Sequence, residues 1–193
     1  MRAFFCIPIG ERLRTDIAGV SHRLREGSRM SASWVRSENY HVTVRFLGEI
    51  DPMMTTELHA ICRGVSSHVD PFALPVDRIG AFPSLDRPRV LWAGGDAPEI
   101  FVQMTDALNQ RLSEQGFPLE RKPRVSHITV ARVKGRPDPG LAGLLGTMNP
   151  LGFAPAHVDR IVLMQSELSR NGARYSPLFT VPLGGSGRPD EGA

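Results

Sequence analysis

The chain has 193 residues, of which 41% are hydrophobic and 22% are charged, an ordinary balance for a folded globular protein. This composition excludes disorder over most of the chain, and the length suits one good-sized domain or two small lobes that share a core. The net charge of +3 is compatible with an anionic ligand such as RNA, but many proteins without such a ligand are equally basic.

The first predicted element is a strand over residues 2–9, an apolar run that Gly10 ends. The run is too short for the core of a signal peptide or for a membrane span, so we expect a cytoplasmic protein with no membrane association. Cys6 and Cys62 have no metal-type spacing, and we expect both to be reduced and buried.

Strands and helices then alternate. Apolar Leu13, Ile17, Val20 and Leu24 recur at helical spacing and predict an amphipathic helix over residues 11–26. Further helices are expected at 51–69, 98–115 and 141–148, and further strands at 40–47, 72–79, 89–93, 126–133, 158–168 and 175–183. We expect one bilobed domain over residues 1–183 and a disordered, glycine-rich tail over 184–193.

Two of the predicted strands carry the same signature. His41 and Thr43 lie two positions apart in one strand, and His127 and Thr129 lie two positions apart in another, with apolar residues between and after them. Since side chains alternate along a strand, each strand presents an imidazole and a hydroxyl on one face and apolar side chains on the other. The second histidine follows the first by 86 positions (from 41 to 127), which suggests two lobes of approximate internal symmetry that deliver one motif each to a common cleft.

Two imidazoles across a cleft suit general acid and base catalysis, because histidine titrates near neutrality. Hydroxyls beside them can donate hydrogen bonds to oxygens that gain negative charge. Together they favour the attack of water on an anionic centre, as in hydrolysis of a phosphodiester. No metal or other cofactor is expected, since neither motif contains a carboxylate and no metal-type spacing of histidines or cysteines occurs.

With these motifs the chain resembles the two-histidine phosphoesterase superfamily, and within it the RNA 2',3'-cyclic phosphodiesterases, also called LigT-like proteins or 2'-5' RNA ligases. The residues that carry the resemblance are Arg2 to Phe5, His41 to Glu49, Phe82-Pro83, Arg89 to Trp92 and His127 to Arg132. The resemblance implies a bilobed α+β fold, with antiparallel sheets lining a central groove and helices outside.

The resemblance also implies that a terminal 2',3'-cyclic phosphate is hydrolysed to a 2'-phosphomonoester. His41 would be the proton donor to the leaving 3' oxygen, His127 the proton acceptor from water, and Thr43 and Thr129 would hold phosphate oxygens. The assignment of acid and base rests on the family, because the two motifs are symmetric.

Two arginines are candidate phosphate contacts. Arg132 matches an arginine that commonly follows the second motif in the family, although strict alternation places it on the face opposite His127, so a bulge near Ala131 is required. Arg45 is a second candidate, because alternation along the predicted strand places its side chain on the same face as His41 and Thr43.

The expected partner is RNA with a 2',3'-cyclic phosphate end or a small cyclic nucleotide, bound by a monomer. Two alternatives stay open. One is joining of RNA ends through a 2'-5' bond, and the other is a non-catalytic RNA-binding or nucleotide-binding module.

Overall fold

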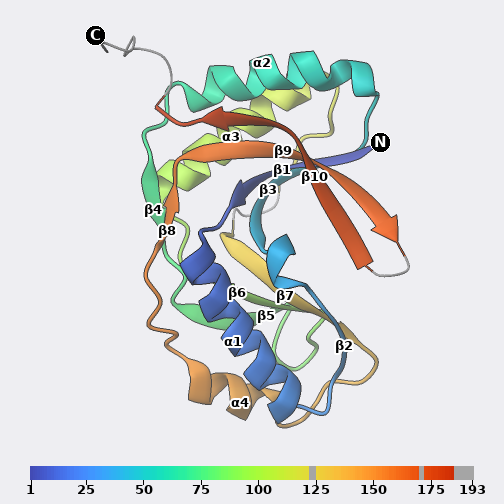
Figure 1. Ribbon diagram of the computed structural model, residues 1–193, viewed down its shortest axis with the longest axis vertical. Coiled ribbons are helices and arrows are strands. Elements are labelled where there is room, and N and C mark those ends of the chain that lie inside the picture. The colour runs from blue at the N-terminus through green and yellow to red at the C-terminus, as the bar shows by residue number, and fades with distance from the viewer. Residues whose placement is uncertain (122–124, 170–171, 185–193) are drawn as a thin grey trace.

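The computed structural model describes residues 1–121, 125–169 and 172–184, which form an α+β fold around one eight-stranded sheet. All strand pairings are antiparallel, and the main strand order is β10-β9-β1-β3-β7-β6-β5. The β3–β7 junction in the middle is narrow, because only Val42 and Ile128 pair across it. The sheet therefore divides there into two lobes (Figure 1).

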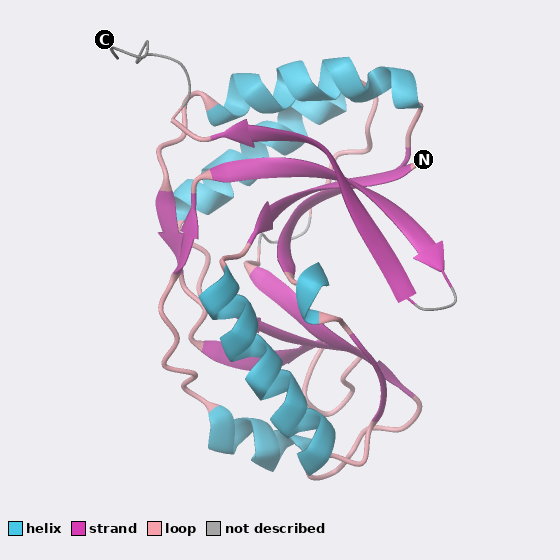
Figure 2. Ribbon diagram, in the orientation of Figure 1, coloured by secondary structure: helices cyan, strands magenta, loops and turns pink. Residues whose placement is uncertain are grey.

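Each lobe combines four strands with two helices. The upper lobe contains β1 (Arg2–Pro8), β3 (His41–Glu49), β9 (Arg160–Ser169), β10 (Gly172–Pro182), α2 (Thr55–Ser66) and α3 (Glu99–Glu114). The lower lobe contains β2 (Ser31–Trp34), β5 (Arg78–Phe82), β6 (Val90–Gly94), β7 (His127–Lys134), α1 (Glu11–Gly27) and α4 (Leu141–Met148). Figure 2 shows α2 along the top of the molecule and α1 and α4 in its lower half. This arrangement confirms the predicted bilobed α+β fold.

The remaining elements are short. Strands β4 (Phe72–Leu74) and β8 (Ala156–Val158) form a separate two-stranded ribbon, and single 3-10 turns occupy η1 (Ser37–Asn39) and η2 (Pro52–Met54). Of the tail expected to be disordered, only Gly184 belongs to the described residues. Within the part of the chain that the structure describes, no helix is both long enough and apolar enough to cross a membrane.

The internal symmetry extends to the register of individual residues. Pro8 lies opposite His41 and Cys6 opposite Thr43 in the β1–β3 pair. In the β6–β7 pair, 86 positions further on, Gly94 lies opposite His127 and Trp92 opposite Thr129. The β1–α1–β3 and β6–α3–β7 units are thus two copies of one structural repeat.

Helix placement links the two repeats. Helix α1, which follows β1, packs against β7, and α3, which follows β6, packs against β3. The apolar face predicted for α1 is confirmed, since Leu13, Ile17, Val20 and Leu24 are all buried. Because each helix packs against a strand of the other repeat, burial of apolar surface within each lobe holds the two repeats together.

Candidate active site

Strands β3 and β7 begin at the two motif histidines, so both imidazoles lie at the junction of the lobes. A groove of about 440 Å³ runs along this junction. Five of the six predicted site residues line it: His41, Thr43, His127, Thr129 and Arg132. The sixth, Arg45, does not.

The backbone fixes the tautomer of His41. Its Nδ1 lies 2.7 Å from the carbonyl oxygen of Asn39, and because a carbonyl only accepts, Nδ1 carries the proton. Nε2 then faces the hydroxyl of Thr43 at 3.1 Å. In the neutral ring this Nε2 has a lone pair, and in the imidazolium it carries a second proton that it can donate.

His127 is oriented in the same way. Its Nδ1 donates to the carbonyl oxygen of Val125 at 3.1 Å, which leaves Nε2 as the second functional nitrogen. Strand β6 passes very close at this point, since a Cβ on Gly94 would lie 2.3 Å from the carbonyl oxygen of Ser126. Only glycine permits this approach, so Gly94 contributes to the position of His127.

Aromatic rings surround both imidazoles. Tyr175 of β10 contacts His41 edge-on, with ring centroids 5.3 Å apart, and Phe4 lies 4.9 Å from the same ring. Phe82 of β5 contacts His127 edge-on at 5.1 Å and stacks on Trp92. These rings restrict the orientation of each histidine and remove water from around it.

This environment lowers the pKa of both histidines. Burial is the main cause of the lowered pKa of His41. The hydrogen bond to the Asn39 carbonyl raises this pKa, whereas the positive charges of a protonated His127 and of Arg132 lower it further. Burial followed by Arg132 likewise lowers the pKa of His127, although its bond to Val125 opposes the shift. Without a bound anion, both rings therefore favour the neutral form near pH 7.

A shift in strand register brings Arg132 to the groove. Thr129 pairs with Trp92, but Ala131 pairs with the adjacent Leu91, so Val130 is an extra residue on β7. The extra residue reverses the alternation beyond it, as in a β-bulge, and returns Arg132 to the side of His127. The bulge that Arg132 requires is thus present, at Val130.

The same shift turns Arg45 away from the groove and into the wall of the smaller hollow that adjoins it, so Arg45 as a phosphate contact stays a prediction. Thr43 pairs with Cys6 and Arg45 with the adjacent Phe5, which makes Val44 the extra residue on β3. Arg45 is consequently buried, with 6% of its surface exposed. Its guanidinium forms a 2.6 Å ion pair with Glu120 and donates to the carbonyl oxygen of Pro118. The side chain that takes the groove position is Phe46.

Sequence reasoning missed Asn39, which anchors the carbonyl that holds His41. The Asn39 amide donates to the backbone oxygen of Ala173 on β10 at 2.8 Å. The equivalent residue of the second repeat is Val125, 86 positions later, whose side chain cannot form such a bond. The residues whose carbonyls hold the two histidines are therefore anchored differently, and applying the 86-residue offset to the sequence would have exposed this difference.

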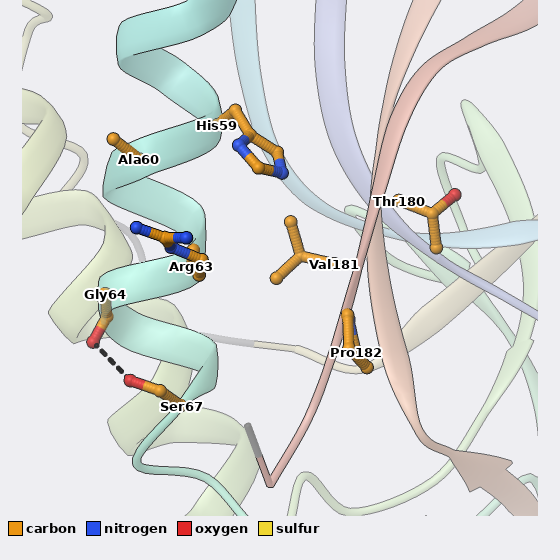
Figure 3. A pocket seen from close by; sticks show the side chains of 8 residues that line it. All are labelled: His59, Ala60, Arg63, Gly64, Ser67, Thr180, Val181 and Pro182. Atoms are coloured by element: carbon orange, nitrogen blue, oxygen red, sulfur yellow. Dashed lines mark hydrogen bonds between the residues drawn. The ribbon is translucent and has the colours of Figure 1, made fainter. Parts of the chain in front are cut away.

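The surface of the described residues has further hollows. One of about 300 Å³ adjoins the groove and shares Thr43, Phe46, Phe82 and His127 with it. Another, of about 590 Å³, lies between α2 and β10 and contains none of the predicted site residues (Figure 3). Its wall includes His59 and Arg63 of α2 and Ser67, which directly follows this helix, and Ser67 donates to the Gly64 carbonyl oxygen at 3.3 Å.

Named relatives share much of this sequence. The RNA 2',3'-cyclic phosphodiesterase of Aeropyrum pernix is 37% identical over 157 residues, which cover 80% of this chain and 88% of the relative. The enzyme of the same name from Thermotoga maritima is 31% identical over 182 residues, covering 93% and 94%.

Solved structures have the same fold. A crystal structure from Thermus thermophilus matches with a TM-score of 0.81 and 26% identity, covering 97% of this chain and all of that one. E. coli LigT in complex with 3'-AMP matches with a TM-score of 0.72 and 25% identity, covering 94% and 97%. The model of the LigT-like phosphoesterase family matches residues 8–92 and 96–175. The chain therefore belongs to the LigT-like phosphoesterase family of enzymes.

Proposed function

We propose that the protein hydrolyses the 2',3'-cyclic phosphate at the end of an RNA to a 2'-phosphomonoester. The observation that carries this proposal is the pair of imidazoles in one groove, each with Nδ1 bound to a backbone carbonyl and Nε2 available for proton transfer. The names of the relatives from Aeropyrum pernix and Thermotoga maritima support the same reaction and the same class of substrate.

In this mechanism His127 acts as the general base. Its lowered pKa keeps Nε2 unprotonated near pH 7, so that it can accept a proton as the water oxygen attacks phosphorus. The bond between phosphorus and O3' breaks, and protonated His41 donates its Nε2 proton to O3'. One water molecule is added, and the product is a 2'-phosphate with a free 3' hydroxyl.

His41 must be protonated for its role, although burial lowers its pKa. A bound cyclic phosphate carries a negative charge, which raises the pKa of a nearby histidine by charge attraction. The substrate thus favours the catalytically competent form of His41. In this form Nε2–H donates to Thr43 until the leaving oxygen takes its place.

In this mechanism Thr43, Thr129 and Arg132 hold the phosphate oxygens. All three line the groove together with both histidines, and the guanidinium of Arg132 suits bidentate binding of phosphate. Such donors stabilise the charge that develops on the equatorial oxygens in the transition state.

Each lobe supplies one histidine, so we propose that residues 1–183 act together as one bilobed domain and that a monomer is sufficient. We also propose that the reaction needs no metal ion. The described residues contain no cluster of three or more histidine, cysteine, aspartate or glutamate side chains that could hold one, and two histidines already provide both proton transfers.

The test is incubation of the purified protein with EDTA and a short RNA that ends in a 2',3'-cyclic phosphate. We expect a 2'-phosphate product. A 3'-phosphate would contradict the assigned leaving oxygen, and activity only after addition of a divalent cation would contradict metal independence. Adding an RNA with a 5' hydroxyl tests 2'-5' ligation, while binding without any product would indicate a non-catalytic module.

A further inference from the structure

Strands β9 and β10 continue beyond the sheet as a hairpin. Pairing of β1 with β9 ends at Gln165, whereas β9 and β10 stay paired with each other as far as Ser169 and Gly172. We call residues 166–169 and 172–175 the hairpin arm. Strand β10 lies at one edge of the sheet, and Figure 1 shows this end of the hairpin projecting from the upper lobe. Contacts outside the sheet must therefore fix the place of the arm.

Two contacts tie the hairpin arm to His41. The backbone oxygen of Ala173 accepts the amide of Asn39 at 2.8 Å. The backbone oxygen of Asn39 in turn accepts the Nδ1 proton of His41 at 2.7 Å. Two positions further along β10, the ring of Tyr175 meets the imidazole edge-on, with centroids 5.3 Å apart. One short stretch of β10 thus acts both on the nitrogen that fixes the tautomer and on the plane of the ring.

The ring of Tyr175 also has a support of its own. It meets Phe4 of β1 edge-on, with centroids 5.0 Å apart, and Phe4 lies 4.9 Å from the imidazole of His41. The three rings are therefore in mutual contact. A turn of the imidazole about its Cβ–Cγ bond would displace one of the other two rings, so the contacts favour a single orientation.

The other histidine has a ring neighbour but no counterpart of the hairpin arm. Phe82 of β5 meets His127 edge-on at 5.1 Å, while the carbonyl that holds Nδ1 belongs to Val125, whose side chain can neither donate nor accept a hydrogen bond. The ring neighbour and the carbonyl thus belong to two separate segments. The arm acts on the histidine to which the proposed function assigns the proton donor.

We propose that the hairpin arm is a positioning element for His41, with Tyr175 as its positioning residue. This inference rests on the proposed function, because it takes His41 as the proton donor to the leaving oxygen. The arm holds Nε2 of His41 toward the groove, where this oxygen leaves. A displacement of about 1 Å can slow a reaction about 100-fold, so a small rotation of the imidazole is enough to impair the proton transfer.

The first test measures kcat and KM with adenosine 2',3'-cyclic phosphate. Tyr175→Ala removes the ring and should lower kcat by about 10-fold to 100-fold, with KM within about threefold of wild type. If this variant does not fold, Tyr175→Leu takes its place with the same expectation, because it keeps apolar packing against Phe4.

Two control variants separate the ring from the hydroxyl and from the rest of the arm. Burial raises the pKa of the Tyr175 phenol, so Tyr175→Phe removes no charge near pH 7 and should keep kcat within about threefold. Leu168→Ala truncates an exposed apolar side chain of the same arm and should leave kcat and KM unchanged. A loss in Tyr175→Phe or in Leu168→Ala as large as that in Tyr175→Ala would overturn the inference.

A second readout, NMR titration of the imidazole signals, does not depend on turnover. Burial is the main cause of the lowered pKa of His41, so water that replaces the Tyr175 ring should raise this pKa. The alkaline limb of the kcat profile, where His41 loses its proton, should move to higher pH as well. Phe82→Ala is the matched variant, and it should raise the pKa of His127 instead. An unchanged His41 pKa in Tyr175→Ala would overturn the inference.

Other groups that face His41 stay the same in this comparison. The charges that act on its pKa belong to His127 and Arg132 of β7, and Arg36 lines the same groove. The thiol of Cys6 on β1 is neutral, because burial raises its pKa to about 12. None of these groups is altered by the substitution of Tyr175, so the shift reports the loss of the ring.

A double variant tests whether both contacts belong to one arm. Asn39→Ala removes the hydrogen bond to Ala173, and Tyr175→Ala removes the ring contact. If the arm acts as a unit, the double variant should lose little more kcat than the more impaired single variant. Two losses that multiply would show independent contacts and would refute the arm as one positioning element.

Failure of this inference differs from failure of the proposed function. If the wild-type protein does not hydrolyse the cyclic nucleotide, the proposed function fails, and the titration of His41 alone decides on the arm. If the wild type hydrolyses it and Tyr175→Ala does so equally well, the function stands and the positioning role is refuted.

Discussion

Arg45 offers a sharp test of the strand register, because its side chain forms a buried ion pair outside the groove. Its ion pair with Glu120 is set in place by Asn109 of α3, which bonds both the backbone NH and the carbonyl of Glu120. Truncating one partner of a buried ion pair costs about 3–5 kcal/mol. Since the Glu120 side chain is 35% exposed, water can solvate the remaining charge, and we expect Arg45→Ala to cost about 2–3 kcal/mol.

For a chain of this length such a loss corresponds to a decrease in Tm of about 5–10 °C. Calorimetry or urea unfolding measures it, and kcat of the folded variant on a cyclic nucleotide should stay within about threefold of wild type. The double variant Arg45→Met with Glu120→Gln removes both charges and keeps most of the packing, so it should regain much of the stability. Unchanged stability together with a hundredfold loss of kcat in Arg45→Ala would refute this reasoning and restore Arg45 as a phosphate contact.

Four further outcomes are expected. His41→Ala and His127→Ala should each lower kcat by about 10²–10⁴-fold with an unchanged circular dichroism spectrum, and a variant that keeps normal turnover would remove the mechanism. Arg132→Gln should lower kcat/KM by about 10-fold to 100-fold. It should also move the pH optimum upward, because it removes a positive charge that lowers the pKa of both histidines. A pH optimum that moves downward would contradict this reasoning. Asn39→Ala should lower kcat more than it raises KM, with Asn39→Gln failing to rescue it, and an unaltered kcat would separate the Ala173 bond from catalysis. Below the unfolded-state histidine pKa of about 6.5, the unfolded chain binds more protons than the native protein, because both native histidine pKa values are lowered. The free energy of unfolding should therefore decrease as the pH falls. The His41→Ala/His127→Ala double variant should lose most of this pH dependence.

Much of the fold follows from local patterns along the chain. The spacing of Leu13, Ile17, Val20 and Leu24 specifies one apolar face, and burial of that face agrees with it. The region from Phe72 to Ile79 shows the limit of such patterns. The apolar run predicts one strand over 72–79, but Phe72–Leu74 pairs with β8 and Arg78–Phe82 forms a separate strand that pairs with β6. Pairing partners distant in sequence decide such boundaries, and a local apolar run carries no information about them.

The sequence by itself determined the two motif strands, the 86-residue repeat and the composition of the histidine and threonine set, because alternation within one strand is a local property. It also determined that the motifs are symmetric. Only the tertiary structure decided which arginine reaches the groove. The extra residues at Val44 and Val130 depend on the register of β3 and β7 against their neighbours, and one inserted residue moves every following side chain to the other face. The sequence also contains the difference between Asn39 and Val125 at equivalent positions, but only the structure shows that the Asn39 side chain is anchored to β10.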